Sequence, residues 1–115
     1  MDYKRGDIVL VNFNPQKKKE EVGKVRPAII MSDTELNNVL DLVYVIALTT
    51  NLIEDSEPLR IRITKREALK VDSDAMVEQL RNVAKVRVGE RIACVSSDEM
   101  EKIEYGVKLM LGLKD

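Results

Sequence analysis

The stretch "LVYVIAL", residues 42–48, is the most continuously apolar part of the sequence. It has the length of one strand, and because it has no polar face it predicts a strand buried on both sides, in the middle of a sheet. The run ends abruptly at "TTN", residues 49–51, where the chain should emerge at the surface. We therefore expect the other elements to pack around residues 42–48.

Further strands are predicted on both sides of this central one. Before it lie "GDIVLVNF", residues 6–13, and "RPAIIMS", residues 26–32, joined by a polar segment that predicts an exposed loop. Pro27 has no N–H to donate, so it should mark the first position of its strand or a sheet edge. After the central strand, "LRIRI" places Leu59, Ile61 and Ile63 on one face and two arginines on the other, which predicts a strand with a wet, basic face. Two more short strands are expected within residues 75–95.

The C-terminal residues 96–113 predict a helix. Ser96 and Glu99 have capping-box spacing, and Gly112 supplies a stop. Apolar residues recur every three or four positions, as Met100, Ile103, Val107 and Met110, a stripe more typical of a core or a dimer seam than of a ligand site. Six or so short strands and one helix indicate a mainly β fold, most simply a small, partly open antiparallel barrel, although an α+β sandwich fits the pattern as well.

The amino-acid composition limits which metal sites and catalytic groups the protein can have. The 115 residues predict one domain, 1–115, and the absence of a long apolar run or an N-terminal leader predicts a cytoplasmic protein. Cys94 is the only cysteine and there is no histidine, so a zinc site lacks its usual ligands and we expect no metal and no cofactor. Any general base must come from another residue type, such as a carboxylate.

The net charge of −1 disfavours a protein that binds nucleic acid through charge alone. Basic residues nevertheless gather in three clusters, and a solvated surface of mixed charge explains each cluster, taken alone, equally well. The clusters are Lys17, Lys18, Lys19, Lys24 and Arg26; Arg60, Arg62, Lys65 and Arg66; and Arg81, Lys85, Arg87 and Arg91.

Five blocks, taken in order, resemble the MazF/PemK family of toxin ribonucleases, over essentially the whole chain. They are "KRGDIVLVNFNP" (4–15), "EEVGKVRPAIIMS" (20–32), "VIALTTN" (45–51), "EQLRNVAKVR" (78–87) and "MLGL" (110–113). The resemblance implies an SH3-like barrel of the CcdB/MazF type with a C-terminal helix, usually a homodimer. It also implies the toxin of a type II toxin–antitoxin system, which cuts single-stranded RNA at short sequences without metal, by attack of the ribose 2′-hydroxyl, and which a cognate antitoxin silences.

The same resemblance implies the catalytic residues. Arg26, the arginine of the Arg-Pro pair, matches a catalytic arginine, and its permanently charged fork suits stabilisation of phosphate oxygens better than proton donation. Thr49 matches the catalytic threonine, with Thr50 as the alternative if the register differs by one. Glu21 is the candidate proton acceptor, although Lys19 and Glu20 replace the small residue and serine that family members often carry beside it. Each of these residues also has a purely structural interpretation, as a strand cap, a satisfied hydroxyl or a loop charge.

Several further residues are candidates for binding RNA. Gln79, with Arg81, matches the family's Gln-x-Arg stretch, and we expect both on one strand, facing the same side, although a polar anchor that holds the barrel closed fits equally well. The remaining candidates, the lysines of the first loop among them, are Lys17, Lys18, Lys19, Lys24, Thr50 and Arg87. Two other functions remain open: a gyrase-poisoning toxin of the same fold, and a non-catalytic SH3-like module that binds RNA or protein.

Overall fold

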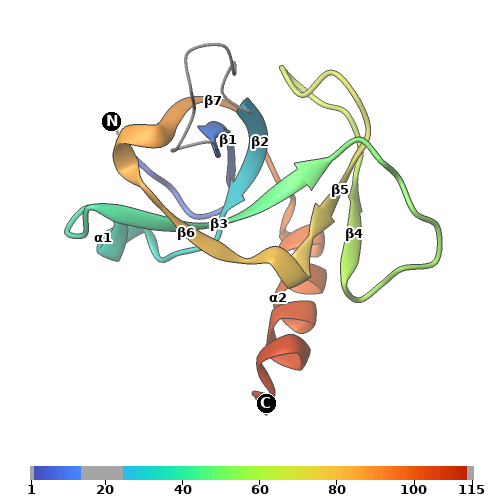
Figure 1. Cartoon of the computed structure of the whole chain (residues 1–115). Coiled ribbons are helices and arrows are strands. Elements are labelled where there is room, and N and C mark those ends of the chain that lie inside the picture. The colour runs from blue at the N-terminus through green and yellow to red at the C-terminus, as the bar shows by residue number, and fades with distance from the viewer. Residues whose placement is uncertain (1, 14–24, 114–115) are drawn as a thin grey trace.

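The computed structural model describes residues 2–13 and 25–113 (Figure 1). These residues form a mainly antiparallel β fold with a C-terminal helix, as the sequence predicts. The strands are β1 (Asp7–Asn12), β2 (Val25–Ile30), β3 (Leu42–Thr49), β4 (Arg60–Ile63), β5 (Ser73–Met76), β6 (Arg81–Ala84) and β7 (Val88–Cys94). The α-helices are α1 (Thr34–Asn37) and α2 (Ser97–Leu111), and the short 3₁₀ turns are η1 (Val77–Gln79) and η2 (Lys85–Arg87).

Strand β3 is the centre of the sheet. One edge pairs with β2, and the other pairs first with β6, over Leu42–Val45, and then with β5, at Leu48 and Thr49. The sheet order is β4-β5-β3-β2-β1-β7, with β6 attached to β3 beside this path. Since Val43, Val45, Ile46 and Leu48 are all buried, the prediction of a strand covered on both faces is confirmed.

Apolar residues pack on both faces of this sheet. The first core cluster contains Ile46, Leu48 and Ile61 and is covered by α2 through Ile103. The second contains Val11, Ala28, Ile30, Val43 and Val45, and the strands β7, β1, β2, β3 and β6 curve around it (Figure 1). Successive residues of β3 therefore serve two different cores, which explains why its sequence has no polar face.

Helix α2 forms as the capping pattern predicts. The Ser96 side chain accepts from the Glu99 N–H while the Glu99 carboxylate accepts from the Ser96 N–H, and Gly112 ends the helix at φ 72°. Ile103 is fully buried, and Met100 and Val107 are partly buried against the first cluster. At 15 residues, α2 is the longest described helix, and none in the described part of the chain could span a bilayer.

Two details of the strand prediction are wrong. Pro27 is the third residue of β2, an interior strand, which tolerates it because pairing with β3 begins only at Ala28. Leu59 is 42% exposed, because it lies in the turn that enters β4 and its N–H donates to the Ser56 carbonyl. The two strands expected within residues 75–95 are β6 and β7. Strand β5 was not predicted, because its "SDAM" segment is polar; it is paired on both sides, with β3 and with β4.

Candidate active site

The strand register places Arg26 and Thr49 on one face of the sheet. Strands β2 and β3 pair Ile30 with Val45 and Ala28 with Ala47, where their pairing ends. Arg26 and Thr49 each lie two residues beyond the Ala28–Ala47 pair, so alternation along the strands puts them on the side of these alanines. Facing residues in an antiparallel pair project to the same side, so both side chains share the face that carries the second core cluster. Arg26 is exposed and Thr49 is half-buried, which leaves the arginine open to a ligand at this end of the barrel.

Thr49 is the last residue of β3. Its cross-strand partner is Asp74 of β5, and its Oγ1 accepts the Asn51 N–H at 3.1 Å. Because that bond uses a lone pair, the hydroxyl proton is available for donation. Thr50 is exposed and lines a different pocket, together with Leu48 and Pro27, on the other side of the strand.

Arg81 lies on the same face as Thr49. It is the first residue of β6 and pairs with Val45, and its guanidinium lies over the Phe13 ring at 5.3 Å from the centroid. Phe13 follows Val11, the cross-strand partner of Arg26, by two residues. This cation–π contact keeps the guanidinium extended over the open end of the second cluster. The contact between Phe13 and Arg81 was not predicted from the sequence. The signal that could have indicated it is the two-residue spacing between Phe13 and the buried Val11, which puts both side chains on the same face.

The expectation that Gln79 and Arg81 share one strand is wrong. Gln79 is exposed and ends the 3₁₀ turn η1, whereas Arg81 begins β6. The physical reason is that β5 pairs with the end of β3 and β6 with its beginning, so the chain between them must run along the β3 edge without pairing. Arg87 is half-buried in η2. The remaining candidates, Lys17, Lys18, Lys19, Glu21 and Lys24, lie outside the described residues.

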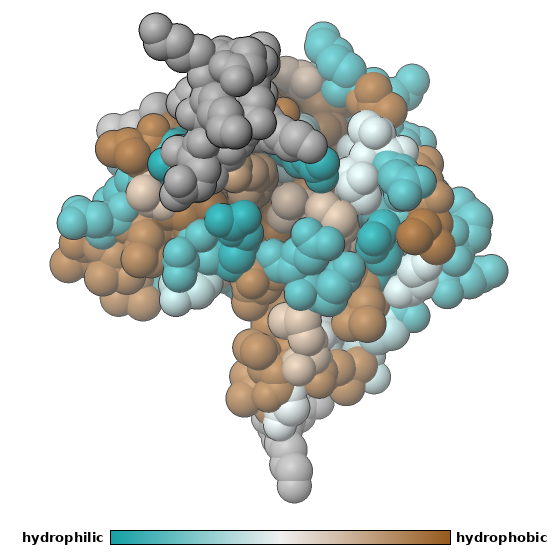
Figure 2. All heavy atoms as spheres, in the orientation of Figure 1, coloured by the Kyte–Doolittle hydropathy of each residue, from teal (hydrophilic) through white to brown (hydrophobic). Residues whose placement is uncertain are grey.

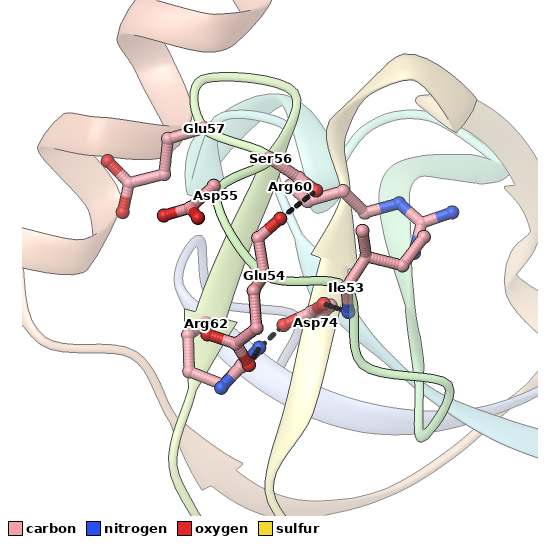
Figure 3. Close-up of a pocket in the computed structure, with 8 residues that line it drawn as sticks. All are labelled: Ile53, Glu54, Asp55, Ser56, Glu57, Arg60, Arg62 and Asp74. Atoms are coloured by element: carbon pink, nitrogen blue, oxygen red, sulfur yellow. Dashed lines mark hydrogen bonds and ion pairs between the residues drawn. The ribbon is translucent and has the colours of Figure 1, made fainter.

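Beside Thr49, β4 and β5 carry an ion pair between the buried Asp74 and the half-exposed Arg62 (Figure 3). The Asp74 side chain is 2% exposed and accepts from Arg62 Nε at 2.6 Å and from the Ile53 N–H at 2.9 Å. Burial raises the pKa of Asp74, but these hydrogen bonds and the Arg62 charge outweigh it, so the pKa lies below its ordinary value. Glu54 also accepts from Arg62 Nη2, at 3.1 Å. The predicted wet, basic face of β4 is thus wrong, because carboxylates neutralise Arg62 and leave it only half-exposed.

The surface of the molecule has distinct hydrophilic and apolar parts. In the view of Figure 2, hydrophilic side chains form a band across the middle of the molecule, while apolar side chains are exposed near α1 and on α2. Val39 and Val86 are the most exposed of the large apolar side chains in the described residues, with exposed fractions of 77% and 93%. Within residues 2–13 and 25–113, no group of histidine, cysteine or acidic side chains is arranged to hold a metal ion.

Comparison with known proteins agrees with the fold. The chain is 29% identical over 114 residues to the endoribonuclease MazF of Staphylococcus epidermidis, which covers 97% of this chain and 93% of that protein. Its fold matches a MazE–MazF crystal structure from Deinococcus radiodurans, with a TM-score of 0.82, 21% identity and 99% of each chain covered. It also matches a mycobacterial endoribonuclease in complex with its cognate antitoxin, with a TM-score of 0.77, 18% identity and 98% of each chain covered.

A protein family also matches most of the chain. The family described as "PemK-like, MazF-like toxin of type II toxin-antitoxin system" matches residues 4–111. That range contains every described strand and the whole of α2. Because it spans nearly the complete chain, this chain belongs to the family of PemK-like, MazF-like toxins of type II toxin–antitoxin systems.

Proposed function

We propose that this chain is an endoribonuclease toxin that cuts single-stranded RNA at a specific sequence, without a metal ion. Family membership and the name of the staphylococcal relative support this proposal. The observation that supports it is strand alternation, which puts the exposed Arg26, the half-buried Thr49 and Arg81 on the face of the second core cluster. A fixed cation, a hydroxyl and a second cation on one open face suit a sugar–phosphate link.

In this reaction the 2′-oxygen of the ribose forms a bond to phosphorus and the bond from phosphorus to the 5′-oxygen breaks, which leaves a cyclic phosphate. Arg26 stabilises the charge on the non-bridging oxygens, since its planar fork remains protonated at any working pH. The Thr49 hydroxyl, which already accepts from Asn51, donates to the phosphate or the ribose. Glu21 takes the proton of the 2′-hydroxyl, and the departing 5′-oxygen takes a proton from water.

Other residues bind the RNA along its length. We assign Gln79, Arg81 and Arg87, together with Thr50 and the loop residues Lys17, Lys18, Lys19 and Lys24, to contacts with the RNA. We further propose that the chain acts in the cytoplasm as a homodimer and that a cognate antitoxin silences it. Structures of the Deinococcus and mycobacterial relatives with antitoxins support the last point.

The test is cleavage of a long single-stranded RNA by purified, antitoxin-free protein in excess chelator. We expect discrete cuts that leave cyclic phosphate ends. Arg26→Ala should lower the cleavage rate by about 10²- to 10³-fold, the typical effect of removing one preorganised donor. Lys108→Ala is the control, because it removes the same charge from α2, on the opposite side of the sheet.

Two results would contradict the proposal. Intact RNA after long incubation with wild-type protein would remove the enzymatic function. Inhibition of gyrase supercoiling by both wild-type and Arg26→Ala protein, with no RNA cut, would instead favour gyrase poisoning. An intact fold must be shown for Arg26→Ala by its thermal unfolding curve.

A further inference from the structure

A second polar pocket lies on the same sheet face as Thr49. It has a volume of about 500 Å³ and lies between the loop at residues 53–57 and strands β4 and β5 (Figure 3). The register connects it to the candidate active site, because Thr49 pairs with Asp74 and Asp74 pairs with Arg62. Two interstrand spacings, about 10 Å, therefore separate Thr49 from the β4 side of the pocket. Neighbouring nucleotides of one strand can span this separation.

Arg60 is the under-satisfied group in this pocket. Its Nη1 is the only side-chain nitrogen or oxygen atom in the described part of the chain that is buried without a hydrogen-bond partner. The nearest carboxylate, on Glu78, lies 3.8 Å from Nε, too far for a hydrogen bond. Arg62, two residues further on, by contrast donates from Nε to Asp74 and from Nη2 to Glu54. A buried guanidinium nitrogen without an acceptor is costly unless a ligand supplies one.

The pocket lining excludes a phosphate as that ligand. Four carboxylates and two guanidinium groups line the pocket, a net charge of −2, so a phosphate group inside it would be repelled, whereas an uncharged base would not. The side chain of Ile53, which is 45% exposed, adds an apolar surface and lies beside the Arg60 guanidinium in Figure 3. A flat, neutral group with acceptors along one edge fits this combination of an apolar contact and a donor fork.

We propose that this pocket receives one unpaired guanine base of the RNA, next to the scissile link, and that Arg60 determines this preference. Guanine presents two adjacent acceptors, O6 and N7, which an arginine fork binds in a bidentate manner. Adenine and uracil lack such a pair, and cytosine, which has one at O2 and N3, is the smaller ring and covers less of the Ile53 side chain. The inference rests on the proposed ribonuclease function, because it assigns one nucleotide of that substrate to a separate place on the same face.

The first experiment is cleavage of a random-sequence single-stranded RNA pool, followed by sequencing of the cut ends. Wild-type protein should prefer guanine at one fixed position near the cut by about 5- to 150-fold, the discrimination expected of one bidentate contact. Arg60→Gln should abolish that preference and still cut the RNA. Arg60→Lys should not restore it, because an ammonium lacks the fork. Lys108→Ala, the control that removes a charge from α2, should keep the preference.

A binding experiment separates this inference from the proposed function. Fully 2′-O-methylated oligonucleotides cannot undergo attack by a 2′-hydroxyl, so their fluorescence anisotropy with wild-type protein reports binding alone. Replacing guanine by 7-deazaguanine, which lacks the N7 acceptor, should weaken binding to wild type but not to Arg60→Gln. Cuts without a guanine preference, or a preference unchanged in Arg60→Gln, overturn the pocket assignment and leave the ribonuclease standing. Uncut RNA, together with guanine binding that depends on Arg60, would overturn the ribonuclease function and leave the pocket assignment standing.

Discussion

At the scale of single residues, the two adjacent threonines can be told apart. Thr49 faces the side where Arg26 and Asp74 lie, whereas Thr50 lines a pocket with Leu48 on the other side. We predict that Thr49→Val lowers the RNA cleavage rate at least about tenfold, since only the hydroxyl is lost, and we propose that this hydroxyl donates to the reacting group. Thr50→Val, the isosteric change at a residue that we assign to RNA binding, should raise the RNA concentration needed for saturation but change the cleavage rate at saturating RNA less than about threefold. An equal loss in both variants would contradict the face assignment, as measured by initial cleavage rates at saturating RNA.

The family resemblance identified Arg26, Thr49 and Arg81 as candidate site residues from the sequence alone, because each belongs to a short recognisable motif. It could not find Asp74 or the unused donor of Arg60. Both depend on which residue faces which across β4 and β5, and neither strand carries a local signal for that register. A carboxylate between a serine and an alanine simply reads as a loop residue.

At the scale of elements, α2 is fixed to the sheet by a close approach at Gly106. A Cβ added there would overlap the Pro58 carbonyl oxygen and come within 3.2 Å of a Val77 methyl group. Helix propensity alone favours alanine over glycine by about 1 kcal/mol, so a helix free of this contact would become more stable. We predict the opposite, a loss of about 1–3 kcal/mol for Gly106→Ala from overpacking.

Urea denaturation measures this prediction, with Glu101→Ala as an exposed helix control that should shift the free energy of unfolding by less than about 0.5 kcal/mol. A more stable Gly106→Ala protein would show that α2 can move away from Pro58. The helix itself was predictable from its cap and its apolar period. Its docking site was not, because the contact joins residues far apart in the sequence.

At the scale of the whole molecule, ion pairs join distant parts of the chain. Glu99, the capping residue of α2, binds the Arg66 guanidinium with both carboxylate oxygens, at 2.6 and 2.7 Å. Burial raises the pKa of Glu99. The hydrogen bonds from Arg66 and Ser96 and the charge of Arg66 lower this pKa by more than burial raises it, so it lies below the ordinary value of 4.5. The depressed pKa of Asp74 acts in the same direction.

A group with a lowered pKa stabilises the folded state in full above its unfolded value and loses this contribution as the pH falls through its folded value. We therefore predict that the free energy of unfolding declines steeply below about pH 4.5. Glu99→Gln should already lose about 1–2 kcal/mol at pH 7, through the weakened cap and ion pair, and should decline less steeply in acid. Denaturant curves at several pH values between 3 and 7 test this. Parallel profiles for the two proteins would contradict it.

The sequence by itself determined the central strand, the capped C-terminal helix, the mainly β class and the family resemblance. These follow from local patterns of apolar period, capping and short motifs, which the physical chemistry of neighbouring residues controls. Only the tertiary structure decided that the polar "SDAM" segment is a buried strand, that Gln79 leaves the strand of Arg81, and that Thr49, Asp74, Arg62 and Arg60 share one face. The reason is that register between strands is set by side chains meeting from distant parts of the chain, which no local pattern encodes.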